Sequence, residues 1–447
     1  MKNIPFFVCI ILWIFITLLR VFTHQPWYDE AHAWEIARSL EFRNFFESMK
    51  LEGHFPIWYL LLMPFAKFDF AYPYSMLMLN WIFCFAAIFL LWRFSPFNNW
   101  LKFLISFSFP FLACYPVVAR CYSVGILPIF LLAMLYKNKL KYPIIYASLI
   151  FFAMNTSFVA ILGTGVLGLY LIFDLYKEKD WKNFAICSGI ALVTFIFLVV
   201  QVLNFQSNAV PIIKVLGLTL QTILSSFSYL NPILNAILLA VLAVGFLVCL
   251  FKEKRMFFFV IFVFTSLLAT FKLVYAGDFW HYYFLYIYLI VACWIGFEQN
   301  NISEKMKKVL TILLSILSFL LIFDVRNEIK VFHSHSKDVA NHMKSHKNDS
   351  LLLVNQVFSA SIPYLRDGKT DYDIKYIQSQ DRTHNIQLNL EFIKNAMNLS
   401  KNNYLYVNSC SPIPDLTTEK SVMKFNLDTN IKNIYCIYKI ELSEKKK

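Results

Sequence analysis

The sequence IPFFVCIILWIFITLLRVFTHQPWYDEAHAW, residues 4–34, joins a long apolar run directly to a pair of carboxylates. Residues 4–22 carry one charged side chain, Arg20, and are long enough to cross a bilayer core of roughly 30 Å as a helix. Asp29 and Glu30 follow within a few residues. Ionisable groups inside a membrane are costly and usually functional, and this pair lies at the end of a predicted span. The stretch therefore predicts a membrane protein and raises the question of what these carboxylates do there.

The composition of the whole chain supports a membrane protein. The 447 residues are 58% hydrophobic and 15% charged, whereas a typical soluble protein is about a quarter charged. The formal net charge of +13 does not indicate nucleic-acid binding, because membrane proteins collect Lys and Arg on their cytoplasmic loops.

Apolar runs recur along the chain and predict a polytopic α-helical protein of about 11 transmembrane helices. We place them near residues 4–22, 73–93, 100–115, 121–136, 142–157, 158–175, 183–203, 231–251, 256–275, 279–297 and 308–324. Residues 1–24 could instead be a signal peptide. The exit of that segment has no small-x-small cleavage site, so we favour an uncleaved span.

Basic residues give the predicted orientation in the membrane. They follow the fourth, sixth, eighth and tenth predicted spans, as Lys137, Lys139, Lys141, Lys177, Lys179, Lys182, Lys252, Lys254, Arg255, Lys305, Lys307 and Lys308. The positive-inside rule makes this side cytoplasmic. The N-terminus is then cytoplasmic, while the first outer loop, residues 23–72, and everything after residue 324 are extracytoplasmic.

Two segments outside the spans have structure of their own. The loop 23–72 has the apolar stripe of amphipathic helices that lie in the membrane interface. The tail, residues 325–447, is rich in polar residues and contains strand-like and helical stretches, which predict a small α/β domain. The strand-like runs are 351–357, 403–409 and 433–442, and the helical stretches lie near 334–346 and 386–399. We therefore expect a membrane domain at 1–324 and an extracytoplasmic domain at 325–447.

Asp29 and Glu30 allow two interpretations. If Pro26 begins a helix, both carboxylates fall in its first turn, where they stabilise the helix N-terminus without doing chemistry. Their position at the end of a span, with His32 next to them, favours a functional site.

Three further places on the predicted outer side hold polar groups. His54 precedes Pro56 at the turn back to the membrane, and is either an interfacial histidine or part of a site. Arg120 stands in an apolar stretch and either snorkels to lipid headgroups or clamps a phosphate with its planar donors. Asp278 and His281 lie within one turn of each other. Together these groups suit activation of a hydroxyl and stabilisation of a phosphate leaving group.

The tail offers two weaker features. His342 and His346 are spaced i, i+4, which fits a metal pair but is more often a solvated helix face. Cys410 and Cys436 could form a disulfide if the tail is outside the cytoplasm.

The order of these motifs resembles the GT-C class of membrane glycosyltransferases. It is most similar to the bacterial family-39-like branch, which is related to protein O-mannosyltransferases and lipid A aminoarabinose transferases. The motifs are WYDEAHAWEIA (27–37), HFPIWYLLL (54–62), Arg120–Cys121–Tyr122 and Trp280–His281. Phe55 replaces a proline of the commoner form, and Trp280 stands where many relatives have arginine. Lys272 or Arg120 would substitute for that missing arginine.

The resemblance implies a reaction and a set of partners. The donor would be a polyprenyl-phosphate-linked sugar in the lipid bilayer, and the acceptor a hydroxyl of a cell-envelope glycan such as lipopolysaccharide, of a lipid or of a protein. Asp29 would be the general base of an inverting transfer, supported by Glu30. Arg120, Tyr122 and His281 would bind the lipid phosphate, and His54 would line the pocket.

His32, Lys272 and Asp278 would support this site. Some members use a divalent metal at the first-loop acid, here Asp29, and no other cofactor is implied. The protein would be located in the bacterial cytoplasmic (inner) membrane.

Three other functions remain open from the sequence. A transporter or flippase of lipid-linked sugars would also need spans and outward polar groups, although few ionisable residues lie in mid-span. An O-antigen ligase or polymerase would place its key residues in a large late loop, whereas here the largest internal outer loop is the first. A catalytically inactive GT-C scaffold would fit the tryptophan at position 280.

Overall fold

The computed structural model describes most of the chain. The described residues are 4–41, 55–68, 71–203, 232–273, 278–299, 302–323, 334–354, 356–366, 371–377, 393, 395–398, 400–407, 423–431 and 435–442. They fall into two compact units, one of Met1–His24 with Ile36–Val331 and one of Gln25–Glu35 with Phe332–Lys447. The predicted domain boundary after residue 324 lies among residues outside the described ranges and stays a prediction.

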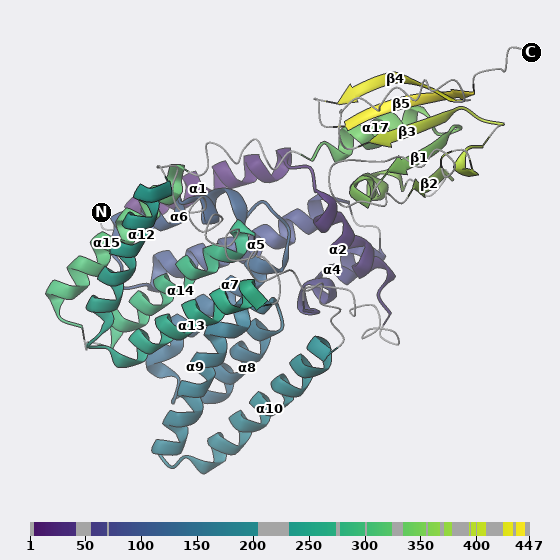
Figure 1. Ribbon diagram of the computed structural model, residues 1–447. Coiled ribbons are helices and arrows are strands. Elements are labelled where there is room, and N and C mark those ends of the chain that lie inside the picture. Colours follow the sequence, from purple (N-terminus) through teal and green to yellow (C-terminus); the bar gives the residue numbers. More distant parts are fainter. Residues whose placement is uncertain are drawn as a thin grey trace, which may run out of the picture. The chain divides into compact units, whose positions relative to one another are not determined.

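Helices make up the first unit almost entirely (Figure 1). They are α1 (Ile4–Thr23), α4 (Ile57–Lys67), α5 (Tyr74–Phe94), α6 (Asn99–Ser106), η2 (Pro110–Cys114), α7 (Cys121–Leu135), η3 (Tyr136–Asn138), α8 (Pro143–Met154), α9 (Phe158–Lys177), α10 (Trp181–Leu203), α12 (Pro232–Leu250), α13 (Lys254–Leu273), α14 (Phe279–Glu298) and α15 (Glu304–Phe323). A further helix, α2 (Tyr28–Ser39), begins in the segment grouped with the second unit.

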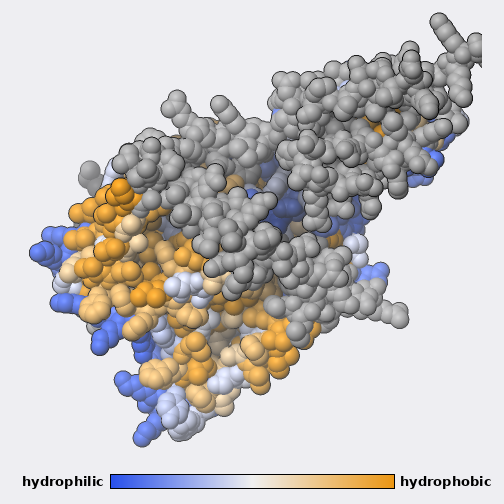
Figure 2. All heavy atoms as spheres, viewed as in Figure 1, coloured by the Kyte–Doolittle hydropathy of each residue, from blue (hydrophilic) through white to orange (hydrophobic). Residues whose placement is uncertain are grey.

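Seven helices within the described residues are long and apolar enough to cross a membrane. They are Pro5–Thr23, Tyr74–Phe94, Cys121–Asn138, Phe158–Lys177, Trp181–Gln201, Lys254–Phe271 and Phe279–Glu298. The most buried of them is α14, whereas α10 exposes large apolar side chains such as Leu192 and Phe195. Figure 2 shows this apolar surface in orange. Exposing side chains of this kind to water costs free energy, so the prediction of a polytopic helical membrane protein is confirmed.

The third predicted span, residues 100–115, is not one continuous helix. It is α6 followed by the short π-helical turn η2, which begins at Pro110, a residue without a backbone N–H. The indole N–H of Trp13 donates to the Phe111 carbonyl at 2.9 Å. A side chain of another helix thus binds a carbonyl of the irregular segment, and such support is how membrane proteins tolerate broken helices.

The end of this irregular segment is held in the same way. The carbonyl of Tyr115 accepts hydrogen bonds from the Asn80 side-chain amide at 2.7 Å and the Ser123 hydroxyl at 2.6 Å. Asn80 and Ser123 are buried, so α5 and α7 both hold the backbone at the point where α7 is about to begin.

The basic loops predicted to share one side do meet at one end of the helical unit. Lys139, beyond the C-terminal end of α7, lies 3.0 Å from a carboxylate oxygen of Asp174 near the end of α9. Arg255, at the start of α13, donates to both oxygens of the same carboxylate. Three of the predicted cytoplasmic loops are therefore tied together, while their side of the membrane remains a prediction.

Helix α9 approaches α14 closely at Gly163. The Tyr288 hydroxyl of α14 bonds to the carbonyls of Val159 and Ala160 at 2.9 and 3.0 Å, which fixes the tyrosine ring against α9. A Cβ added at Gly163 would overlap that ring, whereas one added at Gly189 in α10 would meet nothing within 4 Å.

We expect Gly163→Ala to destabilise the protein by about 1–3 kcal/mol, because the anchored Tyr288 ring cannot move aside. The measurement is the apparent Tm of the detergent-solubilised protein. Gly189→Ala is the matched control and should leave the Tm unchanged or slightly higher, since alanine favours helix. Equal Tm values for the two variants would contradict this packing.

The second unit contains a five-stranded mixed sheet in the order β2-β1-β3-β5-β4. Its strands are β1 (Ser350–Val354), β2 (Asp373–Ile377), β3 (Asn403–Val407), β4 (Met423–Ile431) and β5 (Tyr435–Leu442). β1 pairs in parallel with β2 and β3, and β5 pairs antiparallel with β3 and β4. The α/β tail predicted from the sequence is thus confirmed.

Helix α17 (Ser336–Ser345) packs on this sheet. Because side chains alternate along a strand, Leu351 and Leu353 of β1 face the helix together. The buried core consists of Val339, Ala340, Met343, Leu351, Leu353, Leu365, Tyr404, Tyr406 and Ile437. Leu365 ends the 3-10 segment η4 (Gln356–Leu365), which also contacts α17. The predicted helix near 386–399 lies mostly outside the described residues.

Candidate functional site

A buried hydrogen-bond chain joins the N-terminal ends of α7 and α14. The Tyr122 hydroxyl lies 2.7 Å from Nε2 of His281, and both side chains are buried. The other ring nitrogen of His281, Nδ1, accepts the backbone N–H of Asp278 at 2.8 Å. Asp278 is the N-cap of α14 and forms a reciprocal capping box with His281.

This geometry fixes the protonation of the His281 ring. Nδ1 faces an N–H donor and must supply a lone pair, so the proton of the neutral ring sits on Nε2. His281 then donates to the Tyr122 oxygen. The ring acts as a neutral brace between the two helices and fixes the position of the Tyr122 hydroxyl.

Arg120 is the N-cap residue of α7 and lies next to this chain. It is partly exposed, and its charge is close enough to act on the His281 ring. On the same side, the Tyr115 hydroxyl donates to the Trp280 carbonyl at 2.8 Å. The structure therefore gathers Arg120, Tyr122, Asp278 and His281, all singled out from the sequence, and adds Tyr115.

These groups sit at the opposite end of α7 from the Lys139–Asp174 ion pair. Arg120 precedes the first residue of α7, and Lys139 follows the turn η3 after its last residue. The predicted separation of the polar site from the basic loops thus holds within the helical unit.

Asp29 and Glu30 lie in the first turn of α2, as predicted. Glu30 is fully buried, and its carboxylate accepts the backbone N–H of Trp27 at 3.1 Å. This contact is the helix-capping role that the sequence left open, and it orients the first turn. Asp29 is partly exposed. His32, one turn further on, stacks on Tyr28 with ring centroids 5.4 Å apart.

The segment carrying these acids is bound by the tail. The Ser336 hydroxyl donates to the Pro26 carbonyl at 2.8 Å, and the Lys337 backbone N–H donates to the Gln25 side chain at 2.8 Å. The Ser334 hydroxyl lies 2.9 and 2.7 Å from the carbonyls of Gln25 and Pro26. The α/β tail therefore fixes the backbone immediately before Asp29.

An ion pair also joins the tail to this segment. Arg366, which follows η4, pairs with Glu35 on α2. Sequence reasoning missed all of these tail contacts because they join residues more than 300 positions apart, for example 308 positions between Ser334 and Pro26. Nothing in the local pattern of either segment indicates the other.

We expect the double variant Ser334→Ala/Ser336→Ala to loosen residues 25–35. It removes hydrogen bonds worth about 1 kcal/mol each and leaves the Gln25 and Pro26 carbonyls without these donors. Amide hydrogen exchange measured by mass spectrometry should speed up at residues 27–35.

The matched control for this pair is Ser400→Ala, whose exposed hydroxyl bonds to Asn398 in the same sheet domain at 2.7 Å. It should leave exchange at 27–35 unchanged. If the double variant exchanges like wild type, these serines do not fix the acidic segment.

Several predicted site residues lie outside the described residues. His54 lies outside the described residues, and so does the side chain of Lys272 in α13. Phe55, next to His54, is buried, and the Ile57 N–H donates to the Asn155 carbonyl at 3.4 Å. The predicted disulfide falls on Cys410 and the side chain of Cys436, which are also not described.

Among the described residues, one group of three side chains could hold a metal ion. It consists of His342, His346 and Asp428 in the tail and does not include Asp29. Burial lowers the pKa of the His342 imidazole, which favours the neutral, ligating form, while the hydrogen bond to Asp428 opposes that shift. A metal at Asp29 stays a prediction.

The apolar helices and the polar end of α7 and α14 define a polytopic helical membrane protein. The chain is similar to ArnT from Cupriavidus metallidurans in its apo crystal structure, with a TM-score of 0.58 and 9% sequence identity over 97% of both chains. A second structure of that ArnT, bound to undecaprenyl phosphate, aligns over 98% of both chains with a TM-score of 0.44 and 11% identity. No family model matches the sequence. No curated protein matches it either.

The apo structure supports the fold alone, because 9% identity says nothing about individual residues. The predicted resemblance is thereby confirmed as a likeness of fold to ArnT, across both the helical part and the tail.

Proposed function

We propose that this protein is an integral-membrane glycosyltransferase. It would move a sugar from a polyprenyl-phosphate-linked donor to a hydroxyl of an extracytoplasmic acceptor, with inversion at the anomeric carbon. The observation that carries this proposal is the ArnT-like fold over 97% of the chain, in which the arginine and tyrosine at the start of α7 share one polar end with α14. GT-C enzymes of this branch transfer sugars from such lipids.

In the proposed reaction, the acceptor oxygen attacks the anomeric carbon of the donor sugar. The bond from that carbon to the phosphate oxygen breaks, and polyprenyl phosphate leaves with the electron pair. Asp29 takes the proton of the acceptor hydroxyl. Asp29 lies in the first turn of α2, and its carboxylate would be the general base for this step.

Arg120 would stabilise the charge that develops on the leaving phosphate. Its guanidinium offers planar paired donors and keeps its charge at any physiological pH. Tyr122 would donate to the same phosphate, which fits a hydroxyl whose oxygen already accepts from His281. His281 and Asp278 then act as positioning residues, since their hydrogen bonds run to each other and to Tyr122.

Glu30 would position Asp29 through its cap on the Trp27 N–H. His32 would support the same turn by its stacking on Tyr28. We assign His54 to the pocket wall and Lys272 to the donor phosphate on sequence grounds only. The acceptor would be an envelope glycan, a lipid or a protein, and the site would face away from the cytoplasm of a bacterial inner membrane.

The proposal is tested first in cells that lack the protein. Mass spectrometry of the cell-envelope lipids, glycans and proteins should lose one hexose-like or pentose-like mass, and the wild-type gene should restore it. The polyprenyl-phosphate sugar should accumulate in the deletion strain.

A second assay separates transfer from transport. Purified protein in detergent is mixed with lipid extract from the deletion strain and with the acceptor identified in the first experiment. Micelles have no two sides, so a flippase gives no product there, whereas a transferase does. Absence of product from protein that elutes as a single folded species would contradict the proposed activity.

A further inference from the structure

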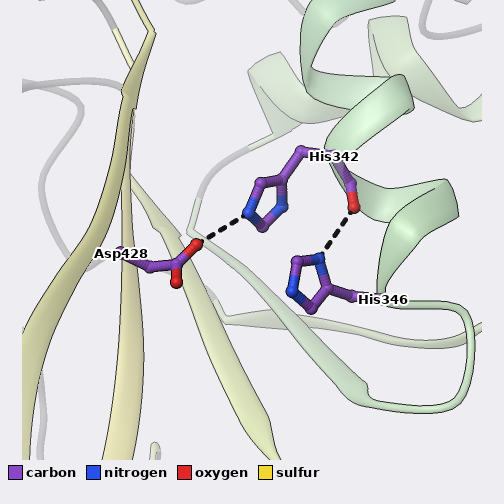
Figure 3. Close-up of side chains that lie close together, drawn as sticks. All are labelled: His342, His346 and Asp428. Atoms are coloured by element: carbon purple, nitrogen blue, oxygen red, sulfur yellow. Dashed lines mark hydrogen bonds and ion pairs between the residues drawn. The ribbon is translucent and has the colours of Figure 1, made fainter.

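Two histidines and an aspartate from separate elements of the tail meet at one place (Figure 3). His342 lies in the last turn of α17, His346 is its C-cap residue, and Asp428 lies in the strand β4. One ligand atom from each lies within 4.8 Å of the others. The rings of the two histidines stack, with centroids 4.3 Å apart.

His346 is oriented by contacts at one ring nitrogen. Its Nδ1 lies 3.0 Å from the His342 backbone carbonyl, which can only accept a hydrogen bond, and 3.0 Å from the Ser345 hydroxyl. When Nδ1 donates to that carbonyl, Nε2 presents a lone pair. A histidine that donates one ring N–H to a backbone carbonyl and offers the other nitrogen is the usual arrangement of a metal ligand.

His342 is oriented on both sides. Its Nδ1 lies 3.0 Å from the Tyr406 hydroxyl, and its Nε2 lies 2.9 Å from a carboxylate oxygen of Asp428. When the Tyr406 hydroxyl donates to Nδ1, Nε2 carries the ring proton and donates it to Asp428. When Nδ1 donates to Tyr406, the Nε2 lone pair faces the carboxylate, and a metal ion between them would bind both.

We propose that His342, His346 and Asp428 form a binding site for Zn²⁺ in the extracytoplasmic domain, with a fourth coordination position open to water. The ligands would be Nε2 of each histidine and a carboxylate oxygen of Asp428. Metal binding replaces the bridging proton between His342 and Asp428, and that proton leaves to solvent. This site is separate from Asp29 and does not depend on the transfer reaction.

The donor set and its spacing favour zinc over the alkaline-earth ions. Two imidazoles and one carboxylate are typical of zinc, whereas Mg²⁺ and Ca²⁺ prefer oxygen ligands alone. Tetrahedral bonds of about 2.0–2.1 Å would place neighbouring ligand atoms about 3.3 Å apart. The present 2.9 Å between His342 and Asp428 therefore opens only slightly when a zinc ion enters.

Partial burial makes the site accessible and selective. The His342 side chain is 11% exposed and that of Asp428 is 33% exposed, so an ion can enter past the carboxylate. Tyr406 belongs to the domain core, and its hydrogen bond with Nδ1 orients the His342 ring. Since β4 is an edge strand of the sheet, the ion would link α17 to that edge.

The test uses the full-length protein in detergent, purified with a tag that contains no histidine and stripped with a chelator. Zinc is titrated against a chromophoric competitor, and bound metal is counted by elemental mass spectrometry after desalting. Wild type should retain one zinc per chain. His346→Gln and Asp428→Asn should each weaken zinc binding at least tenfold.

The matched control is His335→Gln. His335 pairs with Asp338 at 3.0 Å and is thus a histidine–aspartate pair of the same unit that belongs to no three-ligand cluster among the described residues. It should bind zinc like wild type. Size-exclusion elution and far-UV circular dichroism show whether each variant is folded. The zinc titration of wild type tests for a bound ion without relying on any variant.

Three outcomes would overturn the proposal. Wild type could retain no zinc after desalting. The control could lose zinc as strongly as His346→Gln. Or the zinc could persist in His346→Gln and Asp428→Asn but vanish in Asp29→Asn, which would place it in the first outer loop.

Discussion

Replacing Asp29 by asparagine should reduce the transfer rate by about 10²–10⁴-fold, the usual contribution of a general base. Asparagine has the same shape, and Glu30 still caps the Trp27 N–H, so α2 should begin at the same residue. What it lacks is the ability to take the acceptor proton. Donor binding should change little, and the loss should appear in kcat.

The measurement is the sugar mass on the acceptor, in the deletion strain and with purified protein. The control is Glu41→Gln, an exposed carboxylate just beyond the end of α2, which should retain wild-type activity. Both variants must reach the membrane at wild-type level. If Asp29→Asn transfers sugar at the wild-type rate, Asp29 is only a helix-capping residue and the base lies elsewhere.

Arg120→Gln should produce the second large loss, about 10²–10³-fold in kcat. Its guanidinium would act on charge that develops on the leaving phosphate, and removing one such donor typically costs this much. The kcat of Arg120→Lys should lie between that of wild type and that of Arg120→Gln, because lysine keeps the charge but loses the planar pair of donors. The rates are measured with the purified protein at saturating donor.

The control is Arg93→Gln. Arg93 is an exposed arginine in the last turn of α5, beside Phe94, and should be dispensable for the reaction. An arginine that only snorkels to lipid headgroups would behave like Arg93 when replaced. Equal activity of the two glutamine variants would therefore remove Arg120 from the site and leave the phosphate to another cation.

Most of the helical fold could be predicted because the signal for each helix lies in its own stretch of sequence. A run of apolar side chains has to leave water, and its length limits where the helix begins and ends. The ends of α1, α5, α9 and α14 lie within a few residues of the predicted spans. The broken crossing at Pro110 could not be predicted, because its support comes from Trp13, far away in sequence.

The tail was predicted less completely for a similar reason. β1, β3 and β5 are rich in apolar and aromatic residues, and their runs were found. β4, with the sequence MKFNLDTNI, is an edge strand whose polar residues hide its pairing. Asp428 lies in that strand, so the sequence showed the two histidines of the tail but not the carboxylate beside them.

The helical part of the site, Arg120 with Tyr122 and His281, could be predicted because each stands at the head of a span. The brace between Tyr122 and His281 could not, since it depends on how α7 and α14 pack. The hydrogen bonds from Ser334 and Ser336 to the segment before Asp29 could not be predicted either, because a serine in a polar stretch does not indicate its partner.

These hydrogen bonds between the tail and the segment before Asp29 have a consequence for biogenesis. Asp29 is translated well before Ser334, which follows Pro26 by 308 residues. At about 5–20 residues per second, roughly 15–60 s pass before the ribosome reaches the tail. A nascent or prematurely terminated chain can insert its helices in this interval but lacks the support for its acidic turn. For the proposed reaction, activity would therefore begin only after the sheet domain has been translated and folded, so that unfinished chains would be inactive.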